Sequence, residues 1–297
     1  MKGTPSDMLD ELAGPSRLAI CYKLVPRLGD PLTVTAHDAP LLDPVDGLTY
    51  VPIPGGGQSD VATDISATAD NLNVEGAAVA PYPTMDSVRA GDWDYARALV
   101  FYLCWADPTK GRHILRSGRI GEVSTGISSF NMEIRGLVQV LTTSIVNLTQ
   151  PGCRHRFGDD LCNLDGNTDP ENWKIEGVVE YVDLDGNGNT VIHSSSLVEG
   201  GSSSAPAQAG GNFAHGYIRM EDGDNAGRIA DIKRSMDGEV VLELPFPYAV
   251  EIGESFTAYY GCDGLRETCV NRFDNIHNMD AEPFMPGTDK LIRVARR

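Results

Sequence analysis

Four of the six cysteines form two local pairs, one on each side of a long stretch with strand-like patterning. The first pair is Cys153 and Cys162, and the second is Cys262 and Cys269. The N-terminus lacks the apolar core of a signal peptide, so we expect synthesis in a reducing cytoplasm, where disulfides are disfavoured. The two pairs therefore favour a four-cysteine metal site, with unligated thiols or disulfides formed later as the alternatives.

The spacing within each pair limits where such ligands can lie. Neither spacing matches the short C-x2–4-C of common zinc sites or the C-x2-C runs of ferredoxins. Seven helical residues rise about 10.5 Å, too far for two ligands of one compact site. We therefore expect Cys262 on a loop and Cys269 inside a helix over 264–278, with Asp263 as its N-cap. A site of this kind would close a loop of about 100 residues and stabilise the fold.

Cys21 and Cys104 belong to a different class of cysteine. Both lie inside apolar strand patterns, LAICYKLV and LVFYLCW. Free cysteine behaves there as a small hydrophobic side chain. We expect these two thiols in the core.

Length and charge set further limits. The 297 residues suggest about two domains. With 24 Lys and Arg against 42 Asp and Glu, the net charge is -18. Proteins that grip DNA need a basic face, so the charge argues against that function but allows nucleic acid to pass by. The longest apolar run, Ala96–Ala106, is far shorter than the roughly 20 residues of a membrane span.

Patterning predicts a mainly β (α+β) chain of two units, 1–150 and 151–297, with few short helices. In the first unit, β structure is expected over 16–53, with a turn at Pro26–Asp30. The segment Asp60–Ala80 is ambiguous between strand and helix. The remaining expected elements of this unit are a short helix at Met85–Gly91, strands at Ala98–Trp105, His113–Val123 and Phe130–Gly136, and a helical segment at Leu137–Thr149.

The second unit is predicted to consist of strands interrupted by a long Gly/Ser-rich loop. Asp237-Gly238 is a hairpin turn signal, and Ser194–Asn212 is expected as a long mobile loop. The expected strands are Ile175–Val182, Thr190–Val198, Tyr217–Met220, Arg228–Lys233, Glu239–Leu244 and Phe256–Tyr260.

Two further motifs have ordinary explanations. The run Asp183–Asn189 matches the start of a calcium loop, but Ser194 stands where the bidentate glutamate is required, and strand patterns flank it. We interpret it as a hairpin turn, with weak calcium binding as the alternative. His155 lies near Cys153, but a metal-bound thiolate would not be free to act as a nucleophile. No enzyme motif is present, and we expect no catalytic residues.

Several blocks of the sequence resemble one family of phage proteins. These are Gly118–Val123, Glu133–Leu137, Cys153–Cys162, Tyr260–Asp263, Thr268-Cys269, Phe273 and Pro283–Gly287. Together they resemble the baseplate hub proteins of gene transfer agents and related siphophages, which are similar in role to tail tip protein L of phage lambda. The resemblance covers about residues 15–290 and is weakest in 194–212 and at the N-terminus.

The resemblance implies a structural virion protein of the tail tip, assembled in a bacterial host cytoplasm. It implies tube-like β-barrel domains and a homotrimer between the distal tail protein hexamer and the central tip or fibre protein, with DNA passing through the lumen. It also implies a [4Fe–4S] cluster on Cys153, Cys162, Cys262 and Cys269, with zinc as the fallback. The alternative functions are a calcium- or glycan-binding β module and a tail-associated cell-wall hydrolase.

Overall fold

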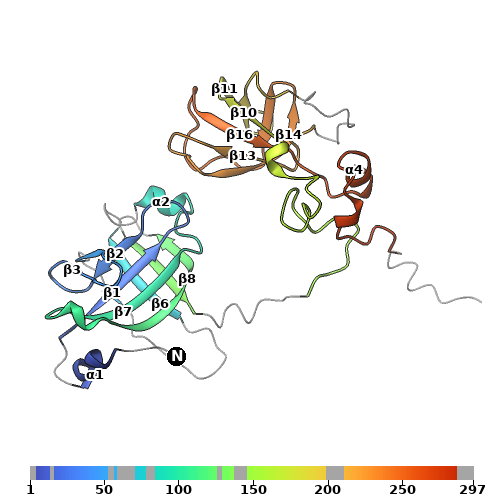
Figure 1. Cartoon of the computed structure of the whole chain (residues 1–297). Helices are drawn as coiled ribbons and strands as arrows, with labels where there is room; N and C mark the ends of the chain where they lie inside the picture. Colours follow the sequence, from blue (N-terminus) through green and yellow to red (C-terminus); the bar gives the residue numbers. More distant parts are fainter. Residues whose placement is uncertain are drawn as a thin grey trace, which may run out of the picture. The chain divides into compact units, whose positions relative to one another are not determined.

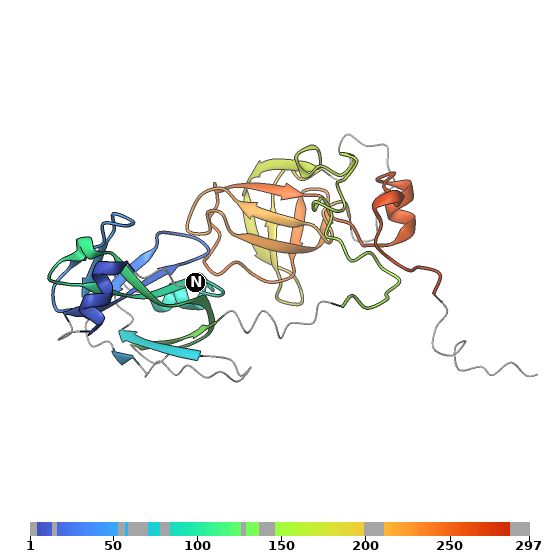
Figure 2. The ribbon, with the colours of Figure 1, turned by 60° about the horizontal axis from the view of Figure 1, so that its bottom comes forward.

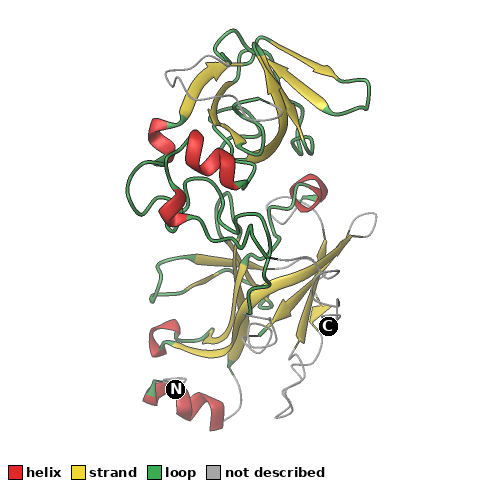
Figure 3. Cartoon of the chain, turned by 90° about the vertical axis from the view of Figure 1, so that its right-hand side faces the viewer, coloured by secondary structure: helices red, strands yellow, loops and turns green. Residues whose placement is uncertain are grey.

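The computed structural model describes residues 5–13, 17–52, 57–58, 71–77, 84–125, 129–136, 146–198 and 211–285. The chain forms two compact units, Met1–Ile145 and Val146–Arg297 (Figure 1). Strands dominate both units and the helices are short, as Figure 3 shows. The expected mainly β fold with few short helices is therefore confirmed.

The first unit is built on one nine-stranded sheet. Its strands lie in the order β3-β4-β2-β1-β7-β8-β9-β6-β5, and every neighbouring pair is antiparallel except β2 and β4. The elements are α1 (Ser6–Ala13), β1 (Leu18–Val25), β2 (Leu32–Thr35), β3 (Leu41–Leu42), β4 (Thr49–Pro52), β5 (Gly57–Gln58), β6 (Asn71–Ala77), α2 (Met85–Arg89), β7 (Arg97–Cys104), the 3-10 turn η1 (Pro108–Lys110), β8 (Arg112–Thr125) and β9 (Ser129–Arg135).

The central strands of this sheet are buried on both faces. Side chains of a strand alternate between faces, so Tyr22 and Leu24 join one apolar cluster while Ala19 and Cys21 join another. Cys21 and Cys104 are fully buried, which confirms the expectation of core thiols. Burial raises the pKa of the Cys21 thiol to about 11, so it stays neutral in the apolar interior.

Strand β8 bends at a β-bulge between Ile120 and Val123, where its pairing with β9 shifts register. Two glycines make the close approach of β8 and β9 possible. A Cβ on Gly118 would collide with the backbone carbonyl of Arg135, whereas a Cβ on Gly121 would meet only the flexible end of the Arg135 side chain.

These two glycines give a paired test of the fold. We expect Gly118→Ala to lower the free energy of unfolding by about 1–3 kcal/mol, because the backbone of β9 must move. Gly121→Ala, the matched control, should cost less than about 1 kcal/mol, since only a side chain is displaced. Urea denaturation of both variants measures the difference, and equal losses would contradict this account of the β8–β9 contact.

The second unit contains seven strands in the order β10-β16-β13-β14-β15-β12-β11, all antiparallel. Its elements are the 3-10 turn η2 (Pro170–Asn172), β10 (Lys174–Val178), β11 (Tyr181–Leu184), β12 (Thr190–His193), β13 (Tyr217–Met220), β14 (Ile229–Met236), β15 (Glu239–Leu242), β16 (Ser255–Tyr259), α4 (Arg266–Asn271) and the 3-10 turn η3 (Ile276–Asn278).

Strands β10 and β11 are two halves of one bent segment, and this closes the sheet into a barrel (Figure 2). At the bend the backbone changes partners. Val179 N–H donates to Glu254 O at 2.8 Å, on the β16 side, and Glu180 N–H donates to His193 O at 2.9 Å, at the end of β12. The first and last strands of the order are thus contiguous in the chain, and each pairs along one side, β10 with β16 and β11 with β12.

Most expected strands form, with shifted ends. The predicted strand Ile175–Val182 divides into β10 and β11, and the predicted strand Thr190–Val198 ends at His193. Asp237-Gly238 joins β14 to β15 with Gly238 at φ 84, as the turn signal predicts. The expected helix at Met85–Gly91 is confirmed as α2. Residues 137–145 and 199–210 lie outside the described residues, and 146–149, expected as helix, are not helical.

The predicted helix over 264–278 is wrong in both of its ends. Helix α4 covers only Arg266–Asn271, with Leu265 in the cap position. Two residues beyond the C-cap Arg272, Asp274 takes φ 48, and Asn275 N–H donates back to Cys269 O at 3.0 Å, so the chain turns away from the helix axis. Asp263 is not the N-cap, although its carboxylate accepts the Leu265 N–H and the Thr268 hydroxyl, each at 2.9 Å.

The run Asp183–Asn189 forms the β11–β12 hairpin, as interpreted from the sequence. The Asp185 carboxylate accepts the backbone N–H groups of Asn187 and Asn189 at 2.8 and 2.9 Å. Its hydrogen bonds with Asn189 lower the pKa of Asp185 to about 2. The carboxylate thus holds the turn together.

Candidate metal centre

The four paired cysteines of the second unit line a single cavity. Cys153 and Cys162 come from the loop segment that precedes the barrel. Cys262 lies on the loop just after β16, and Cys269 lies inside α4, the placement expected from helical rise. Phe157 and Phe273 also line the cavity, together with His155, Thr168, Gly264, Asn275, Asn278 and Met279.

Backbone hydrogen bonds hold the two cysteine segments together. Cys153 N–H donates to Gly264 O at 2.8 Å, and Arg154 N–H donates to Asp280 O at 3.0 Å. Gly264 has φ 71, and a Cβ there would lie 3.3 Å from the Cys153 nitrogen. This position therefore requires glycine both for its conformation and for the close approach of Cys153.

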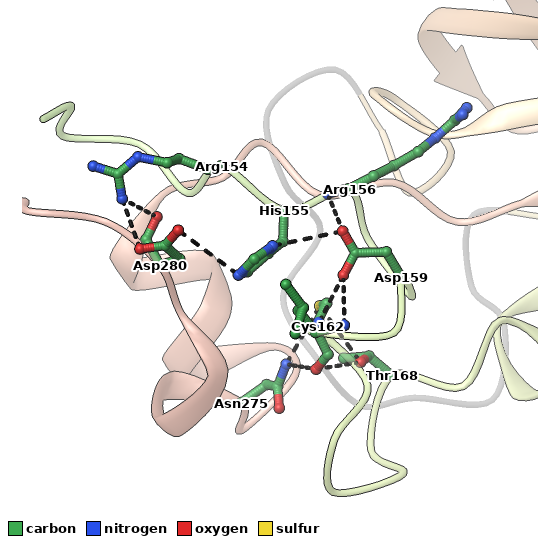
Figure 4. A network of polar contacts seen from close by, with 9 residues as sticks. Arg154, His155, Arg156, Asp159, Cys162, Thr168, Asn275 and Asp280 are labelled. Atoms are coloured by element: carbon green, nitrogen blue, oxygen red, sulfur yellow. Dashed lines mark hydrogen bonds and ion pairs between the residues drawn. The ribbon is translucent and has the colours of Figure 1, made fainter. Parts of the chain in front are cut away.

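The turn that carries Cys162 is organised by the Asp159 carboxylate (Figure 4). It accepts the backbone N–H groups of Arg156, Leu161 and Cys162 at 3.0, 3.1 and 2.7 Å. An aspartate that bonds nearby backbone donors in this way stabilises a tight turn without regular secondary structure. The thiol of Cys162 is thereby fixed toward the cavity wall.

Three donors point at cysteine sulfurs. Asn275 Nδ2 lies 3.4 Å from Cys162 Sγ, the Thr168 hydroxyl lies 3.5 Å from the same atom, and Gly264 N–H lies 3.4 Å from Cys262 Sγ. Asn275 and Thr168 also donate to the Cys162 carbonyl oxygen at 2.7 and 3.0 Å (Figure 4). Donors to sulfur stabilise thiolate ligands and tune the potential of iron–sulfur clusters.

Burial keeps two of these thiols protonated at neutral pH. Desolvation raises the pKa of Cys262 to about 12 and that of Cys269 to about 11. A metal that binds here must therefore displace protons, because the thiolate is the ligand form.

A single metal ion would require the four thiols that share this cavity to lie close together. Around one tetrahedral zinc with Zn–S bonds of about 2.3 Å, sulfurs lie about 3.8 Å apart. Within the described part of the chain, no group of three or more His, Cys, Asp or Glu side chains has an arrangement that could hold one metal ion.

An aromatic cluster connects the cavity wall to the barrel core. Phe157 and Phe273 have ring centroids 4.4 Å apart, and Trp173 packs edge-on to Phe273 at 5.1 Å. Trp173 in turn contacts Tyr260 at 5.7 Å, and Tyr260 lies 4.7 Å from Phe213 in the core. The cysteine-bearing segments are thus packed onto the barrel by large apolar surfaces.

Beyond the cavity, Arg154 joins two segments of the chain. We call the cluster around it the clasp; it consists of Leu148, Gln150, Arg154, Asp280 and Glu282. The Arg154 guanidinium forms ion pairs with Asp280 at 2.7 Å and with Glu282. It also donates to Leu148 O at 2.8 Å, while Glu282 accepts the Gln150 N–H at 3.0 Å. The clasp joins the strandless segment before Cys153 to the strandless segment after η3.

His155 lies at the rim of this network. Its Nδ1 is 3.6 Å from Asp159 Oδ2, and its Nε2 is 3.9 Å from Asp280 Oδ2 (Figure 4). Two carboxylates thus hold the imidazole beside the cavity. This arrangement positions His155 as a packing and polar bridging group rather than as a partner for a cysteine nucleophile.

No local sequence pattern marks Asn275, Thr168 or the clasp residues as part of the site. Asn275 stands 113 residues from the cysteine whose carbonyl and sulfur it contacts. Asp159 did carry a local signal, because an aspartate commonly accepts the backbone N–H two residues ahead, here that of Leu161.

Comparison with known proteins identifies the family. Residues 5–165 match the family described as "Baseplate hub protein, N-terminal attachment domain", and residues 211–289 match the family described as "Phage conserved hypothetical protein BR0599". Because the first match covers more than half of the chain, the chain belongs to the baseplate hub family. No significant match was found among the curated proteins.

A solved structure is similar over nearly the whole chain. It comes from a structure titled "Virion of native gene transfer agent (GTA) particle". The identity is 27%, the TM-score is 0.82, and the match covers 99% of this chain and 97% of the other.

These findings confirm the resemblance seen in the sequence and the expectation of a structural virion protein rather than an enzyme. None of the helices in the described residues is long and apolar enough to cross a membrane.

Asn275 gives a first test of the site. Asn275→Ala removes a buried donor to Cys162, and we expect the free energy of unfolding to fall by about 1–3 kcal/mol. Asn172→Ala is the matched control, because Asn172 is an exposed asparagine of the same unit on the 3-10 turn η2, outside the cavity. Thermal melts of both variants should show the larger loss for Asn275→Ala, and an equal or reversed order would contradict the assigned role.

The clasp should open in acid. Hydrogen bonds from Gln150 N–H and Arg154 hold the pKa of Glu282 below its usual value. A carboxyl group whose pKa is lower in the folded than in the unfolded state stabilises the fold at pH values above its unfolded-state pKa. This contribution is lost as the pH falls through its folded-state pKa. We expect amide hydrogen exchange in 148–154 to speed up, relative to the barrel strands, between neutral pH and about pH 3. Glu282→Gln should show faster exchange already at neutral pH, and unchanged exchange would contradict this.

Proposed function

We propose that this chain is the tail-tip hub that links the distal tail protein ring to the central tip or fibre protein. The observation that carries the proposal is the baseplate hub match over 5–165, whose family description names an attachment domain. The similarity to a gene transfer agent virion chain over almost the full length of both chains supports a role for both units in the particle.

In this proposal three copies form a ring, and DNA passes through its lumen without specific binding. The net charge of -18 supports the second part, because an acidic wall repels phosphates and keeps DNA from adhering during ejection. Two β units per chain are also consistent with a ring of three copies that presents six similar β domains.

The proposal includes a [4Fe–4S] cluster ligated by Cys153, Cys162, Cys262 and Cys269. Three observations support it: all four thiols line one cavity, three donors point at their sulfurs, and no other thiol lines that cavity. Each iron of such a cluster binds its own cysteine, so the sulfurs stand further apart than those around a single zinc ion. Zinc is the fallback ligand in this proposal.

When bound, the cluster would supply a covalent link among four side chains rather than a reaction. Cys153 and Cys162 would be joined to Cys262 and Cys269 across the whole barrel sequence. The same pairs of segments already meet through Cys153 N–H and Gly264 O, so the link would reinforce an existing contact. A structural role follows, because closing a long loop reduces the entropy of the unfolded chain.

Metal analysis tests the cluster directly. Protein purified without air should be brown and contain about four irons and four sulfides per chain. Cys269→Ser should lose most of the iron and melt at a lower temperature, whereas Cys104→Ser, the matched control in the other unit, should keep its iron. Zinc alone would replace the cluster with a single-ion site. Full iron content in Cys269→Ser would remove that residue from the ligand set.

A further inference from the structure

Three arginines stand in one row across the sheet of the first unit. Arg97 on β7 is directly opposite Arg119 on β8, and Arg119 is directly opposite Arg135 on β9. Directly opposite residues of antiparallel strands have Cα atoms about 4.5–5.5 Å apart and project from the same face. We call these three residues the arginine row. Strands β7 and β8 are labelled in Figure 1.

The row is costly for an isolated subunit. Like charges directly opposite each other destabilise a sheet. Arg135 is offset by an ion pair with Glu133 at 2.8 Å, but no ion pair joins Arg97 or Arg119 to any residue within the described part of the chain. Both of these side chains are exposed. The unit thus displays two unneutralised guanidinium groups side by side in a protein whose net charge is -18.

The backbone is built to hold the row in place. Gly121, beside the β8 bulge, leaves the space that the Arg135 guanidinium occupies, and Gly118 lets the β9 backbone approach β8. Both glycines and Arg119 belong to the block Gly118–Val123, and Arg135 belongs to Glu133–Leu137. Neither block contributes a residue to the candidate metal centre.

An aromatic side chain adjoins the row. Tyr95, two residues before Arg97, is 74% exposed and has φ 58. A non-glycine residue in the left-handed region is strained, and such strain is concentrated at functional sites. Tyrosine and arginine are also the residue types that contribute most to binding energy at protein interfaces.

We propose that the arginine row, with Tyr95 beside it, docks the acidic surface of a second copy of this chain. Charge complementarity identifies the occupant: a chain with 42 acidic and 24 basic residues carries an excess of carboxylates, and guanidinium groups bind carboxylates through paired hydrogen bonds. Docking would also remove the repulsion within the row. The inference rests on the proposed homo-oligomer and specifies one of its contact surfaces.

Sedimentation velocity of the full chain tests the proposal. We expect wild type to self-associate at about 50 mM salt and to dissociate at about 500 mM, because exposed ion pairs are screened. Arg97→Gln/Arg119→Gln should weaken self-association by about tenfold. The matched control is Arg27→Gln/Arg89→Gln, which removes two exposed arginines of the same unit outside the row and should change association less than about twofold.

A stability measurement separates docking from folding. The row variant should melt at the same temperature as wild type or slightly higher, because it relieves a like-charge contact. Weaker association with an unchanged or raised melting temperature supports the docking surface. Weaker association that accompanies a lower melting temperature would assign the row a folding role and overturn the proposal.

Other outcomes also separate the hypotheses. If wild type and the row variant associate equally, the homo-oligomer stands and the docking surface is wrong. If wild type stays monomeric at every concentration and salt, the homo-oligomer fails and the docking inference fails with it. If the row variant loses affinity only for a short DNA duplex, measured by fluorescence anisotropy, the row is a phosphate contact instead.

Discussion

The second unit depends on contacts between two segments that lie on opposite sides of the barrel sequence. The segment 146–169 has no regular secondary structure, and the segment 260–285 has only α4 and one 3-10 turn. Neither can bury enough apolar surface alone. Backbone hydrogen bonds at Cys153 and Arg154, the Asn275 amide on Cys162, and the Phe157–Phe273 contact hold them together. The cysteine cavity exists only because these contacts form.

The strands could be predicted because their signals are local. Alternating apolar residues in LAICYKLV mark β1, and Asp237-Gly238 marks the turn between β14 and β15. Closure of the barrel could not be predicted, since Val179 and Glu180 bond to different neighbours far away in the chain. The end of α4 was missed for a related reason: Asp274 takes a positive φ where glycine would have given a stop signal.

The candidate metal centre, like the fold, was predicted only in part. Cysteine pairs in polar surroundings pointed to all four cysteines that line the cavity. Their supporting residues are asparagine, threonine and arginine, which are common on any surface and acquire their roles only through folding. Arg154 meets Asp280 and Glu282 across 126 and 128 residues. No pattern within a single strand or helix carries that information, and the arginine row likewise becomes visible only when the register of three strands is known.

The strand lengths of the second unit have a consequence for aggregation. An open sheet presents unpaired N–H and C=O groups along its outer strands, which template pairing with other chains. The two outer strands here, β10 and β11, are only five and four residues long, and a bend joins them, so each leaves a short row of unpaired groups. Such short outer strands give another chain little backbone to pair with, and the fold of this unit thereby resists strand exchange and amyloid-like stacking.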